Sequence, residues 1–413
     1  MLKNYIIIAW KVLQRHKFFT FVSLFGISFT LMVLMVIVAF MDHLLSPTYP
    51  ELKRDRILYI SKVRFEHKET QSMFRGDLGF SLIKNYITKM ETPEKIGFCS
   101  TSFDKVNAYS ADNKKLELSL KRTDANFWDI TDFEFLEGKP FNQQHIEAGA
   151  RVVVINEATC SGYFGENEQA IGKYIEIGGE KYRVIGVVKN VPLTQMVTAS
   201  DIFVPYSTSA ATLKSTNIVG GYGALLLANS TADFAAIKSE YQEVIKQVEI
   251  PEKYSIFITR ATTYADSFAI DTVGENFSIH PLYLLVSIFS FLFMLLPTVN
   301  LVNLNITRIM ERSSEIGVRK AFGASSNRLL GQFIVENLMI TLIGGLIGIA
   351  MTWVVINWLN GSGFIPYLDL KINFRVLGGS LIVCLIFGLL SGVLPAYRMS
   401  KVHVVEALKS GGA

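Results

Sequence analysis

The sequence predicts a membrane protein with four transmembrane α-helices and a large α+β extracytoplasmic domain inserted between helices 1 and 2. Three observations predict this fold class. Half of the 413 residues are hydrophobic, and only 18% are charged, against about 25% in soluble proteins. Four long apolar runs stand apart in the chain, and basic residues lie on alternate connections between them. This composition excludes a disordered chain, a nucleic-acid-binding arm and an ordinary soluble enzyme.

Each apolar run is long enough to cross a membrane as a helix. The runs lie at 18–40, 282–306, 333–359 and 376–395. A hydrocarbon core about 30 Å thick needs about 20 helical residues, and a spanning segment must satisfy its own backbone hydrogen bonds. The first run is longer than a signal-peptide core, and no small-x-small cleavage site follows it. We therefore expect it to remain as an anchor.

Basic residues predict the orientation of the spans. They are concentrated in 1–17, 307–332 and 396–413, so we expect these segments and both termini to be cytoplasmic. The connections 41–281 and 360–375 are then expected outside. In 1–17, one helical face can hold Tyr5, Ile8, Trp10 and Leu13. An amphipathic helix on the inner surface and a plain extension of the first span both fit this pattern.

The segment 41–281 alternates strand and helix patterns, which predicts an α+β domain that folds on its own. Helices are expected at 157–164 and 232–248, the second with Thr231 or Asp233 near its cap. Gly178-Gly179 predicts a hairpin turn. The strand-like runs lie at 56–64, 115–121, 151–155, 173–177, 181–188, 222–227 and 254–259. Strand, helix and strand at this spacing predict a βαβ-like lobe, and the length fits two lobes.

No residue pattern indicates catalysis or a bound cofactor. The nearest fragment to a phosphate-binding loop is Gly172-Lys173, but Asn167 stands where the first glycine should be and Tyr174 replaces the Ser or Thr. The six histidines are scattered singly. Cys99 and Cys160 both lie in the outer segment, where a disulfide could form. We therefore expect a non-catalytic chain without a metal or cofactor of its own.

The connection between the second and third spans has the pattern of a short helix, a turn and a new helix. Glu315 and Arg319 are four residues apart and can pair on one helical face. Gly323 can end that helix, and Ser325 or Ser326 can cap the next one. Such a segment could pass a push from a cytoplasmic partner into the membrane. An ordinary basic loop that only anchors the topology is the alternative.

This connection also resembles the signature of the FtsX/MacB-like ABC transporter permeases, where the motif forms a coupling helix. The matching residues are Glu315, Ile316, Gly317, Arg319, Lys320, Gly323 and Ala324. The segment 151–189 resembles the periplasmic core of the MacB-type members, and 395–398 and 404–408 resemble the family's C-terminal end. The order of one span, a large outer domain and three spans is also that of the family.

The resemblance implies a permease in the bacterial cytoplasmic (inner) membrane, coupled to an ABC ATPase that binds in trans. ATP and Mg²⁺ would then be held by that ATPase. The implied partners are a second copy or a related permease, membrane lipid and a periplasmic adaptor, with no nucleic acid. Efflux of an extracytoplasmic substrate is the first expectation. An FtsX-type regulator of a cell-wall hydrolase and a Lol-type lipoprotein-releasing subunit are the alternatives, and the sequence leaves the substrate open.

Small and polar residues inside the spans predict helix contacts. Gly344-x-x-x-Gly348 and Gly388-x-x-x-Gly392 allow helices to approach closely, either within one subunit or across a dimer. Glu336 lies near the inner end of its span. Since a charge is costly in hydrocarbon, we expect this carboxylate to cap a helix or to pair with Arg328 or Lys320.

Overall fold

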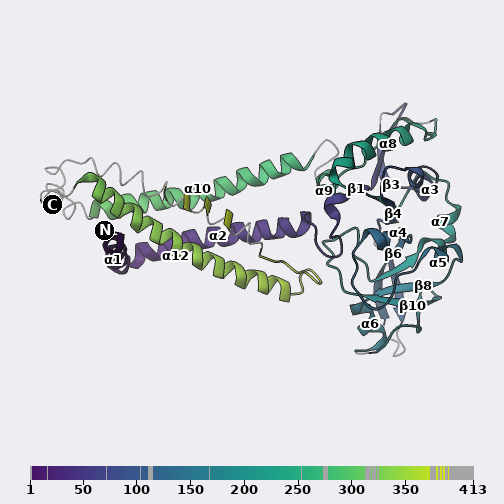
Figure 1. Ribbon diagram of the computed structural model, residues 1–413, viewed down its shortest axis with the longest axis horizontal. Helices are drawn as coiled ribbons and strands as arrows, with labels where there is room; N and C mark the ends of the chain where they lie inside the picture. Colours follow the sequence, from purple (N-terminus) through teal and green to yellow (C-terminus); the bar gives the residue numbers. More distant parts are fainter. Residues whose placement is uncertain are drawn as a thin grey trace. The chain divides into compact units, whose positions relative to one another are not determined.

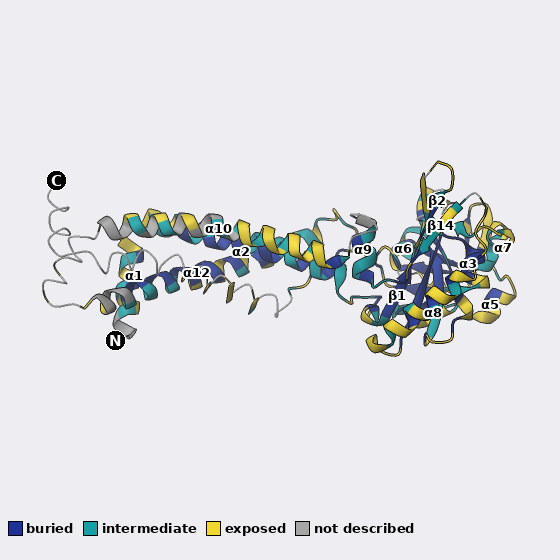
Figure 2. Ribbon diagram, turned by 90° about the horizontal axis from the view of Figure 1, so that it is seen from above, coloured by how far each residue is buried: buried dark blue, intermediate teal, exposed yellow. Residues whose placement is uncertain are grey.

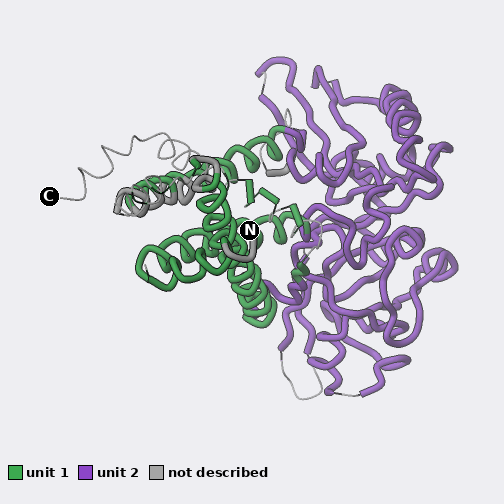
Figure 3. Tube along the Cα trace, turned by 60° about the vertical axis from the view of Figure 1, so that its left-hand side comes forward, with its two compact units in different colours: residues 1–42, 281–362, 370–413 green, residues 43–280, 363–369 purple. Residues whose placement is uncertain are grey.

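The chain divides into two compact units, which are described separately. The computed structural model describes residues 2–15, 17–70, 72–102, 104–109, 115–166, 168–252, 254–272, 278–311, 318, 322, 325–372, 378–379, 382–383, 385–386 and 389. The helical unit comprises 1–42, 281–362 and 370–413, and the sheet unit comprises 43–280 and 363–369 (Figure 3).

The helical unit contains one short amphipathic helix, α1, and several long apolar helices (Figure 1). They are α1 (Leu2–Arg15), α2 (Lys17–Leu45), α10 (Ile279–Glu311) and α12 (Ser326–Gly361). Within the described residues, α2 and the part of α12 from Gly331 to Gly361 are long and apolar enough to cross a membrane. Helix α10 contains the second predicted span, with a shorter apolar part at Ile279–Phe293. The fourth predicted span, 376–395, lies mostly outside the described residues.

Helix α1 is a separate helix and not an extension of α2. The hydroxyl of Thr20 donates a hydrogen bond of 3.0 Å to the carbonyl of Leu13, seven residues earlier. In a continuous helix these residues would be about 10 Å apart along the axis, so the chain must turn between them. Helix α1 contacts α12. Ala9 and Leu13 are buried whereas Trp10 is exposed, so Trp10 does not share the buried face with Leu13.

The sheet unit is built on one mixed 14-stranded sheet. Its strands are β1 (Ile57–Ile60), β2 (Lys62–His67), β3 (Met73–Leu78), β4 (Lys95–Ser100), β5 (Asp104–Tyr109), β6 (Lys115–Thr123), β7 (Phe135–Gly138), β8 (Val152–Asn156), β9 (Tyr174–Ile177), β10 (Glu180–Val188), β11 (Ile202–Pro205), β12 (Val219–Gly220), β13 (Tyr222–Leu227) and β14 (Tyr254–Thr259). The main path runs β14-β2-β3-β13-β4-β6-β11-β8-β10-β7. Between β4 and β6, Cys99 opposite Thr123 is the one paired position in the described ladder.

Short helices surround this sheet. They are η1 (Arg54–Arg56), α3 (Phe80–Asn85), η2 (Ile87–Lys89), α4 (Asn126–Ile130), α5 (Gln143–Glu147), α6 (Glu157–Phe164), η3 (Tyr206–Thr208), α7 (Ala210–Lys214), η4 (Thr231–Asp233), α8 (Phe234–Lys246) and α9 (Tyr264–Thr272). One core packs the sheet against α3 and α8 and includes Phe65, Leu226 and Tyr241. A second core surrounds Trp128 and Phe203. Figure 2 shows the central strands of the sheet as the buried interior of the unit.

Several predicted elements agree closely with the structure. Helix α6 and strands β13 and β14 have the predicted bounds. Gly178 and Gly179 form the β9–β10 turn, where φ values of 61° and 85° favour glycine. Strand β10 pairs in parallel with β8 across α6, which gives the expected βαβ arrangement. Asp233 stands at the N-cap of α8, but the side-chain capping bond before it comes from Ser230.

In the outer segment, one expectation needs correction and one open question is answered. The run 56–64 is two strands, because the chain changes partners at Ser61: β1 pairs with β13, whereas β2 pairs with β3 and β14. Cys99 and Cys160 are both free thiols, so the disulfide left open by the sequence does not form. Their Sγ atoms contact different carbonyls, those of Val197 and Glu168.

Candidate functional site

The seven residues of the predicted coupling helix lie outside the described residues. They are Glu315, Ile316, Gly317, Arg319, Lys320, Gly323 and Ala324. Val318 and Phe322 are the described residues within this stretch. The amide of Phe322 donates a hydrogen bond of 3.1 Å to the carbonyl of Val318, four residues earlier, as in one turn of an α-helix. Phe322 is 88% exposed. Ser325 stands at the N-cap of α12 with extended backbone and no side-chain capping bond.

In the helical unit, two glycines of α12 face α2. A Cβ atom on Gly344 would lie 2.9 Å from the Cγ2 of Ile27, and one on Gly348 would lie 3.0 Å from the carbonyl oxygen of Ser28. Real Cβ atoms essentially never come so close at the first distance, and rarely at the second. The missing side chains therefore allow the two helices to approach within one chain. Gly388 and Gly392 lie outside the described residues.

The contact between α2 and α12, called the seam below, is largely apolar. Its buried side chains include Ile27, Leu31 and Met35 of α2 and Ile340 of α12. The hydroxyl of Thr352 is buried and donates back to the carbonyl of Gly348 at 2.8 Å, so this polar group is satisfied within its own helix.

Glu336 is buried on α12, with 3% of the residue exposed. Its Oε1 accepts a hydrogen bond of 2.9 Å from the Nε2 of Gln332, one turn earlier. Of the two predicted cationic partners, Arg328 is exposed and Lys320 lies outside the described residues. The carboxylate is thus held by an amide group of its own helix, a contact that the sequence did not predict.

In the sheet unit, a buried arginine binds the end of helix α2. Arg54 lies in η1 and is 3% exposed. Its Nη1 donates to the carbonyls of Leu44 at 3.0 Å and Ser46 at 2.9 Å. The last carbonyls of a helix have no partner within the helix and carry its negative dipole end. A guanidinium at this position both satisfies these oxygens and complements their charge.

A buried carboxylate neutralises Arg54. The Nε of Arg54 lies 3.1 Å from Oε2 of Glu51, which is 1% exposed. The same carboxylate accepts hydrogen bonds of 2.9 Å from the hydroxyls of Tyr59 and Thr198. Burial acts to lower the pKa of Arg54, but the adjacent Glu51 carboxylate raises it above its usual value. Because both ions are hydrogen-bonded as well as paired, much of the desolvation cost of burying them is offset.

Gln195 connects this ion pair to the chain that follows α2. Its Oε1 accepts a hydrogen bond from the Nη2 of Arg54. Its Nε2 donates to the hydroxyl of Thr48 at 2.8 Å. In the residue before it, Thr194, the hydroxyl lies 2.9 Å from the Nε2 of His43. The last residues of α2 are therefore bonded to two separate segments of the sheet unit.

Helix α9 links the same cluster to the start of α10. The guanidinium of Arg54 lies 4.0 Å from the ring centroid of Tyr264, the first residue of α9, which is a cation-π contact. Two residues later, the carboxylate of Asp266 accepts a hydrogen bond of 3.0 Å from the amide of Ile279, where α10 begins. A negative group is stabilising at a helix N-terminus. A cation thus holds the end of α2, and an anion holds the start of α10.

We call this set of residues the junction: Glu51, Arg54, Tyr59, Gln195, Thr198, Tyr264 and Asp266. Sequence reasoning missed it. Glu51 and Arg54 follow an apolar span by a few residues, where charged side chains usually meet water or lipid headgroups. Glu51 and Arg54 are three residues apart, which allows them to pair, but this spacing does not show that the pair is buried. Among the described residues, no group of His, Cys, Asp and Glu could hold a metal ion.

Comparisons with known proteins agree with the sequence motifs. Residues 20–244 match the model of the MacB-like periplasmic core domain, and 287–404 match the FtsX-like permease C-terminal model. A macrolide export ATP-binding/permease protein MacB of Hahella chejuensis is 28% identical over 310 residues, which cover 72% of this chain and 43% of that protein. An uncharacterized ABC transporter permease YknZ of Bacillus subtilis is 24% identical over 311 residues, which cover 74% of this chain and 75% of that one.

This chain therefore spans less than half of the length of the MacB relative. Among solved structures, the periplasmic region of MacB from Actinobacillus actinomycetemcomitans matches 52% of this chain, with 16% sequence identity and a TM-score of 0.36. The two matched family models together account for most of the sequence.

Proposed function

Since the chain belongs to the FtsX/MacB-like ABC transporter permeases, we propose that it is the subunit that converts ATP hydrolysis by a separate ATPase into movement of its extracytoplasmic sheet unit. The observation that carries this proposal is the junction. It binds the end of α2 and the start of α10 into the sheet unit by charged hydrogen bonds. The movement would drive efflux or export of an extracytoplasmic substrate.

The junction is suited to transmit displacement because it holds main-chain atoms. Arg54 bonds the backbone of α2, so a shift of that helix reaches Arg54 without passing through flexible side chains of the helix. Glu51 accepts hydrogen bonds from Tyr59 on β1 and from Thr198, so a displacement of Arg54 would pass through Glu51 to these two residues. Charge-assisted hydrogen bonds are shorter and stronger than neutral ones. A directional contact of this kind resists both pulling and rotation.

The ATPase would bind the cytoplasmic side of the chain. We propose that the helix around Glu315 to Lys320 docks in a groove of the ATPase. Gly317 would permit close approach, and the fork of Arg319 would bind carboxylates or carbonyls. Catalysis, ATP and Mg²⁺ would then belong to that partner. The permease itself would act in the bacterial inner membrane as a homodimer or with a related permease, and an adaptor would complete the complex outside.

Reconstitution with a candidate ATPase tests this proposal. We expect Arg319→Glu and Gly317→Leu to abolish ATPase recruitment in a pull-down and ATPase stimulation in proteoliposomes, because they reverse a charge or obstruct the contact. An interfacial charge pair disrupted in this way costs about 2–5 kcal/mol. Lys11→Glu, at an exposed position of α1, is the matched charge-reversal control and should behave like the wild type. Wild-type recruitment and stimulation by both coupling variants would rule out the docking assignment.

A further inference from the structure

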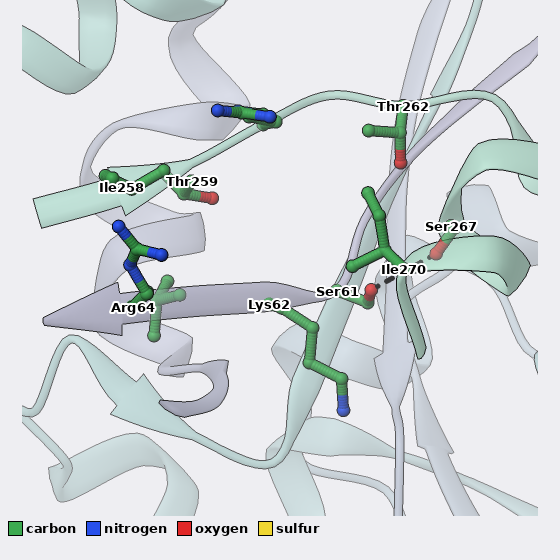
Figure 4. A pocket seen from close by; sticks show the side chains of 10 residues that line it. Ser61, Lys62, Arg64, Ile258, Thr259, Thr262, Ser267 and Ile270 are labelled. Carbon is green, nitrogen blue, oxygen red and sulfur yellow. Dashed lines mark hydrogen bonds between the residues drawn. The ribbon is translucent and has the colours of Figure 1, made fainter. Parts of the chain in front are cut away.

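Strand β14 lies at one end of the main path of the sheet, and among the described strands it pairs with β2 alone. Figure 4 shows Ile258 and Thr259 of β14 beside β2. The outer edge of such a strand presents amide and carbonyl groups that can pair with another chain, and natural sheets protect such edges with proline, charged side chains or bulges. Strand β14 has a bulge near its start, at Tyr254 and Ile256, but it contains no proline and no charged residue.

Alternate residues at this edge turn their main chain away from the sheet. The carbonyl of Thr259 accepts a hydrogen bond of 3.3 Å from the Nε2 of Gln242 on α8, so it does not face β2. Main-chain direction alternates from residue to residue along a strand, which gives Phe257 the same outward direction. The side-chain amide of Gln242 thus occupies a place that an amide of a further strand would take.

Ala261 continues this outward row beyond the end of β14. The amide and the carbonyl of Thr262 bond Tyr59 of β1 at 3.0 and 2.8 Å, so Thr262 faces the sheet and Ala261 faces away from it. Ala261 is buried, and within the described part of the chain its own amide and carbonyl make no main-chain hydrogen bond. The great majority of buried main-chain polar groups in native proteins are paired. A strand from another protein would supply the missing pairs.

A groove of about 470 Å³ lies between this edge and α8. Phe257 and Ile258 give it apolar surface from the strand, and Ile245 does so from the helix. Extended peptides bind proteins by adding a strand to a sheet edge, where main-chain hydrogen bonds give affinity and pockets for alternate side chains give specificity. The outward row and the walls of this groove supply both parts of that binding mode. The described lining residues are Lys238, Gln242, Ile245 and the stretch 257–262.

The charge of the groove indicates which peptide it fits. Among its described lining residues, Lys238 and Arg260 are charged and none is acidic. Arg260 is exposed and Lys238 is half-exposed, and neither side chain makes a hydrogen bond or an ion pair with another described residue. Acidic side chains on a bound peptide would pair with both. A second copy of this edge would instead bring like charges together across a two-fold contact.

We propose that the groove between β14 and α8 binds an extended segment of an extracytoplasmic protein, which adds a strand to β14 and carries acidic side chains toward Lys238 and Arg260. The outward main-chain groups of Phe257 and Ala261 bond the main chain of the segment, and the apolar walls contact its uncharged side chains. The side of the membrane on which this partner lies rests on the proposed function. The binding itself depends neither on the ATPase nor on the coupling helix.

Fluorescence anisotropy of the full chain in nanodiscs of zwitterionic lipid tests the proposal. The probe is a short fluorescein-labelled peptide in which glutamate alternates with valine, and empty nanodiscs give the background. We expect saturable binding of this peptide and none of the same peptide with lysine in place of glutamate. Two further peptides carry N-methyl groups on the amides of all the valines or of all the glutamates. Since only one edge of a strand can bond β14, one of these two should bind and the other should not.

Charge reversal locates the site. Lys238→Glu combined with Arg260→Glu should weaken binding of the glutamate peptide by about tenfold or more, because the charge pairs across the interface become repulsive. The same double variant should gain binding of the lysine peptide, which also shows that it is folded. Lys181→Glu combined with Arg183→Glu is the matched control and should keep wild-type affinity, because these exposed residues of β10 do not line the groove.

Wild-type affinity of the glutamate peptide for the Lys238 and Arg260 double variant would overturn the proposal, because the peptide would then bind elsewhere. Equal affinity of the two methylated peptides would overturn strand addition. Absence of saturable binding by the glutamate peptide would overturn the proposal as well, and a dimer of the chain that is lost on the double reversal would then assign the groove to a second copy.

Discussion

Helix α2 is held along its middle and at its C-terminal end by opposite kinds of chemistry. At the seam, Gly344 and Gly348 of α12 let two apolar helices touch, and the contact is close packing. At the junction, Arg54 and Glu51 hold the end of the helix by charge and hydrogen bonds. Lipid tails are as apolar as the seam, so shape and van der Waals contact must hold it. At the junction, Arg54 and Glu51 are buried. Their hydrogen-bonded ion pair fixes the orientation of the two side chains as well as their distance. We therefore expect the seam to tolerate small displacements better than the junction does.

The largest expected effect is at the junction. Arg54→Ala would leave Glu51 buried without its cation and would free the last carbonyls of α2. Breaking a buried ion pair on one side costs about 3–5 kcal/mol, so thermal unfolding of the purified chain should begin at a clearly lower temperature. Arg56→Ala, in the same turn η1 but half-exposed, is the control. If the Arg54 and Arg56 variants unfold at the same temperature, the buried ion pair adds no special stability. The contrast between the junction and the seam would then be lost.

A smaller effect is expected at the seam. Gly348→Leu places side-chain atoms where Ser28 and Leu31 already lie. Overpacking of this kind costs about 1–3 kcal/mol, because the helices can move apart to accommodate it. Unfolding in mild detergent with increasing denaturant would measure the loss. Gly361→Ala, at a position where a Cβ meets nothing within 4 Å, should be neutral. A loss at Gly348 as large as that at Arg54 would mean that the seam is as intolerant as the junction.

Asp124 sharpens the comparison, because this buried carboxylate accepts its hydrogen bonds from backbone amide groups. It accepts hydrogen bonds of 3.0 Å from the amides of Phe98 and Phe127. Burial raises its pKa from 3.8 to about 7. The folded chain therefore holds a proton that the unfolded chain releases between about pH 4 and pH 7, and stability should fall as pH rises through that window, by about 1 kcal/mol per pH unit.

Asp124→Asn keeps an oxygen that can accept both hydrogen bonds and removes the titration. The variant should show a flatter stability profile between pH 5 and pH 7 in thermal unfolding measured at several pH values. A wild-type slope in the Asp124 variant would show that another group causes the pH dependence.

The smallest expected effect is at the start of α10. Asp266→Asn keeps a hydrogen-bond acceptor for the amide of Ile279 but removes the negative charge beside the helix N-terminus. Such a charge contributes about 0.3–1 kcal/mol. The loss should shrink as salt is added, because salt screens exposed charges. A loss that does not change with salt would show that the contact acts through packing and not through charge.

Local patterns were predictable, and contacts between distant segments were not. Helix α6 and strands β13 and β14 could be read from a few adjacent residues, because their side-chain periods are unbroken. The division at Ser61 could not, since alternation continues through it and only the change of strand partner ends β1.

The same reason separates the two attachments of α2. The glycine pattern on α12 is written in one short stretch of sequence, so close helix approach was predicted. The junction needs Arg54, Gln195 and Tyr264 from three places in the chain. A charged residue after an apolar span has the same sequence signature whether it meets water or is buried. The fold that buries it is a long-range property.

The hydrogen bonds that Arg54 donates to Leu44 and Ser46 end on main-chain carbonyls. Any residue presents the same carbonyl, so the identity of these two positions is free to drift without loss of the attachment. Glu51, Gln195 and Tyr264 have no such freedom, because each contributes atoms that only a few residue types carry. Random mutagenesis followed by selection for a folded, active permease should therefore recover many residue types at the end of α2 and few around the arginine that holds it.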